Sequence, residues 1–147
     1  MSDSNYDALK LENQLCFPLY AASRRVINQY HPYLSQLDIT YTQYVTMMVL
    51  WEEKRISVKN LGHRLFLDSG TLTPVLKSLE AKGYISRSRS KDDERVLIVE
   101  ITSQGEALKE SALDIPRQVS GCVKLTADEA VTLYRLLYKV LEGTGQQ

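Results

Sequence analysis

Two cysteines, Cys16 and Cys122, are the residues of this chain best suited to do chemistry. Peroxides oxidise a cysteine thiolate to a sulfenic acid, and a second thiol converts that acid to a disulfide. The chain has no CxxC pair, and its two histidines, His31 and His63, add no ligand spacing, so we expect no metal site and no cofactor. Taken alone, a cysteine on an apolar helix face is more often an inert core residue.

The size and composition indicate a single globular unit. The chain has 147 residues, of which 44% are apolar and 24% charged, so disorder is not its main feature. Its apolar runs are far shorter than the ~20 residues of a membrane span. The stretch from Met1 to Asn13 is polar and carries acids, unlike a secretory signal. We therefore expect a cytoplasmic protein with no membrane partner.

The charges are unevenly distributed although they sum to zero. The segment from Lys54 to Arg95 holds ten basic and five acidic residues and is therefore +5, while the remainder is −5. A basic middle favours a polyanionic partner. On charge alone, a solvated charged face explains the segment equally well.

The N-terminal part is expected to be one helix. Apolar residues from Leu9 to Tyr30 recur with a helical period. Pro18 interrupts this stretch and is expected to kink the helix, because it removes a backbone hydrogen bond. The pair His31-Pro32 predicts the helix end, because a residue before proline avoids helical geometry.

Helix-start signals recur through the middle of the chain. Thr40 and Gln43 fit a capping box that opens a helix to about Glu53, and Ser57 can cap a short helix through Leu65. The next helix is expected at 69–82, with three candidate caps: Asp68, Ser69 and Thr71.

The hydrophobic period then changes from that of a helix to that of strands. The segments 84–88 and 96–101 predict a β-hairpin around a charged loop from Ser88 to Arg95. Two further capping boxes, Ser103 with Glu106 and Thr126 with Glu129, predict helices reaching about Val119 and Leu141.

The helices at the two ends are expected to dimerise. The last helix has more than one apolar face and must pack on two sides. The predicted fold is mainly α with a small β-hairpin wing, within the single chain 1–147. Residues 40–101 form a winged helix-turn-helix lobe, and 9–32 with 103–142 form dimerisation helices. Burial of the last helix inside one monomer is the alternative.

The lobe has the features of a DNA reader. The 69–82 helix has one apolar face, and its N-terminal residues suit the base edges of the major groove. The opposite surface also includes Ser78. Asp93 is two residues from Arg95 and can hold its guanidinium. The candidate DNA-binding residues are Ser69, Thr71, Thr73, Lys77, Arg87, Arg89, Lys91 and Arg95. A structural three-helix domain with a solvated hairpin is the alternative.

Several motifs also resemble a known family. The segment LDSGTLTPVLKSLEAKG at 67–83, DDER at 92–95 and ITSQG at 101–105 resemble the MarR family of dimeric winged-helix repressors. LENQLCF at 11–17, Tyr20 and ITYTQY at 39–44 resemble its OhrR branch, whose members sense organic hydroperoxides. Pro18 departs from the aliphatic residue usual in the family.

The resemblance implies a mechanism. Residues matching 69–77 would enter the major groove of a pseudo-palindromic double-stranded operator, and Arg95 the minor groove. Cys16 would be the redox-sensing thiol, and Tyr30 and Tyr41 match the pair that supports it across the homodimer. Organic hydroperoxide would be the inducer. Cys122 lies where some members carry a resolving cysteine; in others a cellular thiol completes the switch.

Other functions remain open at this stage. A MarR-like repressor released by a small aromatic or phenolic ligand would leave both cysteines passive. A thiol peroxidase is disfavoured, because a winged helix gives no reason for turnover; we expect no enzyme and no catalytic residue. A purely structural interaction protein is disfavoured by the basic wing.

Overall fold

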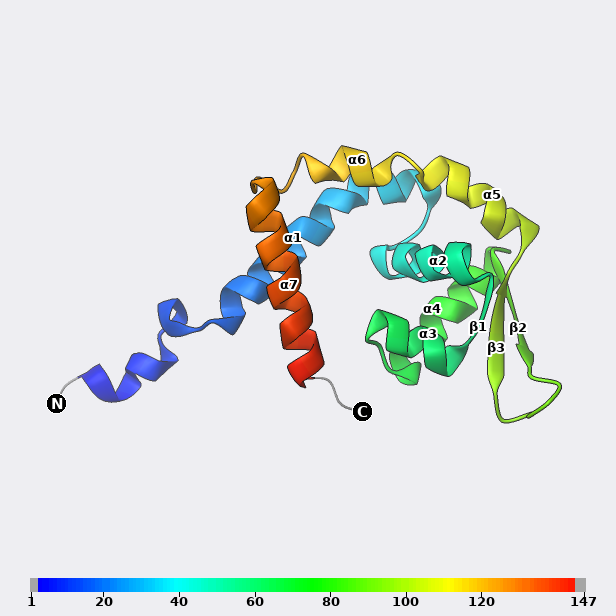
Figure 1. Ribbon diagram of the computed structural model, residues 1–147, viewed down its shortest axis with the longest axis horizontal. Coiled ribbons are helices and arrows are strands. Elements are labelled where there is room, and N and C mark those ends of the chain that lie inside the picture. Colours follow the sequence, from blue (N-terminus) through cyan, green and yellow to red (C-terminus); the bar gives the residue numbers. More distant parts are fainter. Residues whose placement is uncertain (1–2, 145–147) are drawn as a thin grey trace.

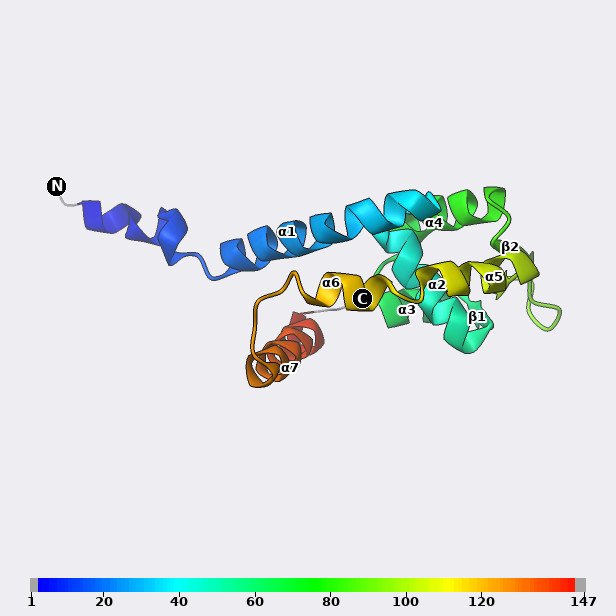
Figure 2. The ribbon, with the colours of Figure 1, turned by 90° about the horizontal axis from the view of Figure 1, so that it is seen from above.

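The computed structural model describes residues 3–144. In Figure 1, α5 (Ser103–Ala112) and α6 (Ile115–Ser120) lie along the top, and α1 (Cys16–Leu34) rises from the left to meet them. Seen from above, α1 runs alongside α6, on which it packs (Figure 2). The lobe beneath holds α2 (Tyr41–Glu53), α3 (Val58–Leu65) and α4 (Ser69–Ala81), with strands β1 (Arg55–Ser57), β2 (Ile85–Arg89) and β3 (Leu97–Ile101).

The sheet has three antiparallel strands in the order β1-β3-β2. The β2–β3 hairpin confirms the predicted wing, and the mainly helical architecture confirms the winged-helix fold class. Strand β1 was not predicted. Its three residues are too short for a recognisable alternation, and they become a strand because Ile56 pairs with Val99 in the middle of β3.

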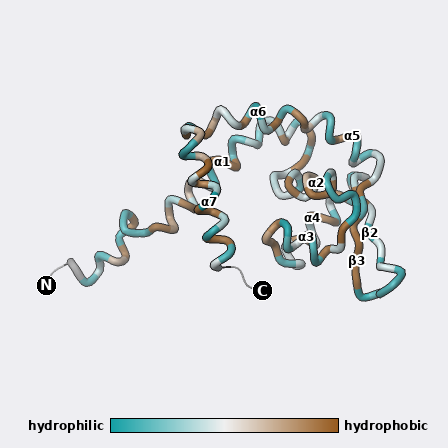
Figure 3. The backbone as a smooth tube through the Cα atoms, viewed as in Figure 1, coloured by the Kyte–Doolittle hydropathy of each residue, from teal (hydrophilic) through white to brown (hydrophobic). Residues whose placement is uncertain are grey.

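The lobe has a continuous apolar core. Three residues of α4, Leu72, Leu76 and Leu79, are almost fully buried against Met47 and Leu50 of α2. Figure 3 shows the matching hydrophobic stretches along α2 and β3. Burial of these side chains supplies the main driving force that fixes α4 in place, at about 25 cal/mol per Å² of apolar surface.

The prediction of one kinked helix from Leu9 was wrong. Residues Asp3–Leu9 and Leu11–Asn13 form short 3-10 helices, and α1 begins only at Cys16. Pro18 lies in the first turn of α1, where its missing N–H would have had no helical partner. The predicted end at His31-Pro32 was also wrong, since α1 continues through Pro32 to Leu34, whose burial holds the last turn.

Local caps explain most of the other helix starts. Thr40 and Gln43 form the predicted capping box, Thr126 and Glu129 form another, and Ser57 and Asp68 cap α3 and α4. The predicted box at Ser103 was wrong by one residue, because Thr102 accepts the N–H of Gly105 at 3.0 Å. The helix predicted at 103–119 is two helices, α5 and α6, with Pro116 in the first turn of α6.

The last helix, α7 (Ala127–Thr144), descends from the upper layer beside the lobe (Figure 1). None of its described residues is buried, although its apolar side chains are numerous. It contacts the lobe through Tyr138, whose ring meets that of Phe66 edge-on at 6.2 Å, in the turn after α3. Much of the rest of its apolar surface is exposed, including Val131, Leu133, Tyr134, Leu136 and Val140.

A first prediction concerns Gly105, at the start of α5. A Cβ atom there would overlap the carbonyl oxygen of Tyr84 and lie 2.7 Å from Cγ1 of Ile101. Gly105→Ala is therefore expected to lower the free energy of unfolding by roughly 1–3 kcal/mol, the usual cost of overpacking. Urea unfolding followed by Trp51 fluorescence measures the loss, since the Trp51 indole donates to the Gly105 carbonyl oxygen at 3.0 Å.

Gly121→Ala is the matched control. A Cβ atom at Gly121 meets no heavy atom within 4 Å, so stability should change by less than about 0.5 kcal/mol. Equal losses in the two variants, at the same protein concentration, would show that the contacts around Gly105 are not tight.

Candidate functional site

Helix α4 presents a polar face to solvent opposite its buried leucines. Asp68 caps the helix by accepting the N–H of Thr71 at 2.7 Å, and bonding from Thr71 lowers the pKa of the Asp68 carboxyl. The first turns therefore begin in a fixed orientation with several hydroxyl groups exposed. The predicted DNA-contacting residues of α4 are all exposed: Ser69, Thr71, Thr73 and Lys77. Such side chains can bond phosphates or base edges.

The wing tip carries exposed cations. Arg95 is 91% exposed, and its Nε lies 3.1 Å from a carboxylate oxygen of Asp93. The same carboxylate accepts the backbone N–H of Arg95 at 3.0 Å, and these bonds from Arg95 lower the pKa of Asp93. The pair orients the guanidinium outward at the tip. Arg89 and Lys91 are also exposed on this hairpin.

Two predicted surface residues instead hold the lobe together. Arg87 is half-buried, and its guanidinium lies 3.0 Å from a carboxylate oxygen of Glu80 on α4. Bonding from Arg87 lowers the pKa of Glu80, so both groups stay charged. This ion pair ties the wing to α4 and leaves Arg87 less available to a phosphate. Ser78, on α4, is likewise half-buried and bonded to Gln43.

The two thiols lie in the outer part of the molecule. Cys16 is the first residue of α1, and Cys122 follows α6 on the way to α7; both are free and exposed. Cys16 is flanked by Leu15 and Phe17, which are exposed too. In one chain, neither cysteine is the buried core residue that its type alone favours.

Tyr30 and Tyr41 lie together at the other end of α1. Their ring centroids are 4.9 Å apart, and both rings contact that of Tyr44. Burial raises the pKa of Tyr30, and burial with the neighbouring Tyr30 raises that of Tyr41. Burial, together with the two neighbouring phenols, raises the pKa of Tyr44 to about 12. These phenols stay protonated at neutral pH and can donate a hydrogen bond.

Cys16 and Tyr30 do not meet within one chain. They are fourteen residues apart on α1, or about 21 Å at the helical rise. Contact between Cys16 and Tyr30 would therefore require a second copy of the chain.

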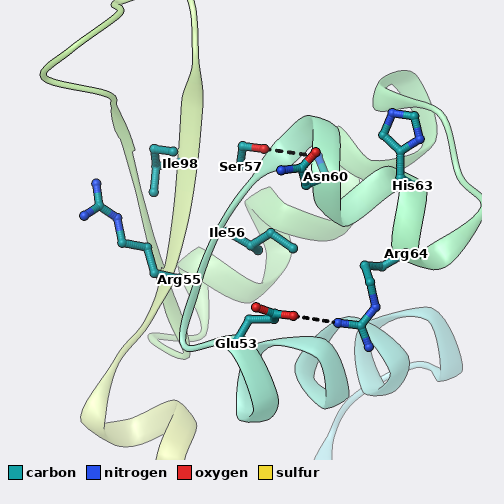
Figure 4. Close-up of a pocket in the computed structure, with 8 residues that line it drawn as sticks. All are labelled: Glu53, Arg55, Ile56, Ser57, Asn60, His63, Arg64 and Ile98. Atoms are coloured by element: carbon teal, nitrogen blue, oxygen red, sulfur yellow. Dashed lines mark hydrogen bonds and ion pairs between the residues drawn. The ribbon is translucent and has the colours of Figure 1, made fainter.

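The lobe has an open pocket of about 720 Å³ between the end of α2, β1 and α3 (Figure 4). Its wall mixes charged, polar and apolar side chains. Arg64 bonds Glu53 and Glu52 at 2.9 Å each, while Arg55 and His63 lie around the rim. A smaller pocket of about 560 Å³ is lined by Lys10, Leu11, Glu12, Gln14, Phe17 and Pro18, the residues that flank Cys16 in sequence.

Comparison with known proteins decides the family. A family model described as transcriptional regulator SarA/Rot matches residues 28–112. The organic hydroperoxide resistance transcriptional regulator of Bacillus subtilis (strain 168) is 46% identical over 145 residues, which cover 99% of each chain. A mutant MarR from E. coli, complexed with operator DNA, is 30% identical with a TM-score of 0.75, over 86% of this chain and 93% of that one. The chain belongs to the MarR family of winged-helix transcriptional regulators.

A redox-regulated relative is also similar to this MarR-family regulator. Reduced AbfR bound to DNA is 36% identical with a TM-score of 0.77, over 95% of this chain and 97% of that one. AbfR of Staphylococcus epidermidis has also been solved with its disulfide formed, and overoxidised and bound to DNA. The protein is thus a DNA-binding transcriptional regulator of the MarR and OhrR type and not an enzyme. Across residues 3–144, no helix is long and apolar enough to span a membrane.

Sequence reasoning missed three residues that shape this site. Glu80 anchors Arg87, while Gln43 and Lys82 join α2 to α4. The predicted capping box includes Gln43, but it gives only the bonds of Gln43 with Thr40 and not the bond with Ser78. Nothing in the sequence pairs Glu80 with Arg87, because their contact depends on how the wing folds over α4.

Proposed function

We propose that this protein is a redox-sensing repressor that binds a pseudo-palindromic operator when reduced. Oxidation of Cys16 by an organic hydroperoxide releases it. The observation that carries the proposal is the exposed Cys16 at the start of α1, in a chain 46% identical to an organic hydroperoxide resistance regulator. The likeness to AbfR, solved in reduced and disulfide-formed states, supports a redox switch.

The repressor acts as a homodimer held by its two end segments. Leu15 is 87% exposed and Val131 is 68% exposed. Clusters of exposed apolar side chains are uncommon on monomeric proteins and mark interaction surfaces. A second copy covers these faces and carries its own Tyr30 and Tyr41 to the first copy's Cys16. Further apolar side chains exposed on the same segments are Phe17, Leu19, Tyr20, Leu133, Tyr134, Leu136, Tyr138 and Val140.

The sensing step is a two-electron oxidation. The Cys16 thiolate attacks one oxygen of the hydroperoxide, so an S–O bond forms as the O–O bond breaks. The organic part leaves as an alcohol after taking up a proton, and the sulfur becomes a sulfenic acid. The N-terminus of α1 favours negative charge on this sulfur, and the protonated tyrosines of the partner copy donate hydrogen bonds to it. The apolar surroundings favour organic hydroperoxides over hydrogen peroxide.

Cys122 resolves the sulfenic acid as an intersubunit disulfide. Its thiol displaces water from the oxidised Cys16 sulfur of the partner copy, joining the two chains. The sulfurs must approach to ~2 Å, which moves the segments that carry them. Because half-sites one helical turn apart demand a fixed separation of the two α4 helices, such a shift lowers operator affinity.

Cys122→Ser tests the resolving role. After treatment with cumene hydroperoxide, the variant should give no covalent dimer on a non-reducing gel, whereas the wild-type protein should give one that reductant dissolves. The Cys16 sulfenic acid should persist in the variant and be trapped by dimedone, because the internal thiol is missing. A covalent dimer in the variant would mean that Cys122 is a spectator.

The operator contacts come from α4 and the wing. Ser69, Thr71, Thr73 and Lys77 enter the major groove, and Arg95, Arg89 and Lys91 bind the adjacent backbone or minor groove.

Fluorescence anisotropy tests the release of the protein from DNA directly. The DNA is a duplex selected from a randomised pool by the reduced protein. Binding that is insensitive to cumene hydroperoxide would refute the redox switch.

A further inference from the structure

Gln43 is one of few buried polar side chains in the lobe, and both its side-chain oxygen and its side-chain nitrogen are hydrogen-bonded. It is 5% exposed. Its Oε1 accepts the backbone N–H of Thr40 at 3.0 Å, and its own backbone N–H donates to the Thr40 hydroxyl at 3.2 Å. Gln43 is therefore rigidly attached to the first turn of α2, which begins at Tyr41.

The same side chain extends to the recognition helix α4. Its Nε2 donates to the Ser78 hydroxyl at 2.8 Å. Lys82, at the end of α4, donates to Gln43 Oε1 at 3.3 Å and to the carbonyl oxygen of Asp38. Directional bonds thus join the first turn of α2, and the loop before it, to the last turns of α4.

The other contacts that hold α4 against α2 are apolar. Leu72, Leu76 and Leu79 hold the helix against α2 without directionality, so they resist separation more than small rotations or slides. Hydrogen bonds weaken steeply when misaligned, and therefore fix the rotation of α4 against α2. The bonds of Gln43 and Lys82 fix this rotation at the end of α2 that carries Tyr41.

We propose that Gln43 is the positioning residue that transmits displacement of Tyr41 to the recognition helix through Ser78. The inference rests on the proposed function, in which Tyr41 supports the partner's Cys16 thiolate. Oxidation removes the negative charge of the Cys16 thiolate, to which the Tyr41 phenol donates a hydrogen bond. Tyr41 and the first turn of α2 then move. Through the Gln43–Ser78 bond, α4 follows. Without this bond α4 keeps its core contacts, the Lys82 bonds and the Glu80–Arg87 ion pair, but it becomes less sensitive to the thiol.

Ser78→Ala tests the inference, with the ratio of operator Kd in the oxidised and reduced states as the readout. The capping box survives in this variant because only the bond between the helices is lost. The ratio should fall by about fivefold, a typical change for a residue in a coupled network. Ser78→Thr keeps the hydroxyl and should restore the ratio, and Lys82→Met, which weakens the same link, should lower it.

Thr46→Val is the matched control. It removes another hydrogen bond of α2, from the buried Thr46 hydroxyl to the Thr42 carbonyl oxygen at 2.7 Å, and leaves the hydrogen bonds between α2 and α4 in place. Its ratio should equal that of the wild-type protein. If the wild-type ratio is above one and Ser78→Ala and Lys82→Met have the same ratio as the wild-type protein, the inference is overturned but the proposed function stands. A wild-type ratio of one overturns the proposed function, and the inference with it.

Discussion

The Cys16→Ser variant is expected to bind operator as tightly as the reduced wild-type protein and to stay bound when organic hydroperoxide is added. The thiol at the start of α1 lies in the outer part of the molecule, away from α4 and the wing, so its loss leaves the DNA-contacting surface intact. A serine hydroxyl cannot form the sulfenic acid that begins the switch. The wild-type protein should lose at least ~10-fold in affinity, the size of a typical coupling free energy.

Anisotropy titrations of both proteins, with and without cumene hydroperoxide, provide the measurement. Dithiothreitol added afterwards should restore wild-type binding, which separates reversible oxidation from damage. Loss of DNA binding by Cys16→Ser under reducing conditions would contradict the sensor model, because Cys16 would then serve the DNA-binding fold itself. Normal release of the variant by hydroperoxide would contradict it as well.

Arg95→Ala is expected to weaken operator binding roughly 5- to 150-fold, the range for one well-placed arginine. The guanidinium is 91% exposed at the wing tip and is oriented by Asp93, so it reaches DNA without rearrangement of the hairpin. The slope of log affinity against log salt should also become shallower by about one for each arginine removed, because fewer counterions are released. Anisotropy titrations at several salt concentrations give both numbers.

Arg117→Ala is the matched control for the wing. Arg117 is also an exposed arginine beside an acid, 3.2 Å from Asp114, but it lies on α6 in the upper layer. Removing it changes the net charge equally, and both the affinity and the salt slope should stay close to the wild-type values. If Arg95→Ala and Arg117→Ala gave the same small loss, overall charge would explain it and the wing would have no specific part.

Local chemistry made much of the fold predictable. The capping box of Thr40 and Gln43 involves side chains three residues apart, and so does the box of Thr126 and Glu129. The wing was evident because β-branched residues surround a charged loop. Each of these signals lies within a few residues of the chain, where the sequence is directly informative.

Several failures involve contacts between distant segments. Strand β1 exists because Ile56 pairs with Val99, and α1 passes Pro32 because Leu34 is buried in the core. The bonds of Glu80 with Arg87 and of Gln43 with Ser78 likewise depend on how the lobe closes. Propensity and spacing carry no information about such pairs, since tertiary contacts override them.

The grouping of the thiol with its tyrosines could not be predicted from spacing in the sequence either. Cys16 and Tyr30, one of its predicted tyrosine partners, are about 21 Å apart along one helix, at 1.5 Å per residue, so neither the sequence nor one chain assembles the site. The family resemblance supplied this grouping. What the structure adds is the exposed apolar surface around Cys16 and the close packing of Tyr30 on Tyr41.

The most direct test of the central claim is the intact mass of the reduced protein after one equivalent of cumene hydroperoxide, with and without reductant. The account predicts a covalent dimer that reductant dissolves, with Cys16 linked to Cys122 in the peptide digest. Oxygen added at Cys16 without a dimer would keep the sensor and assign the second step to a cellular thiol. An unchanged mass would contradict the account, because the thiols would then be passive.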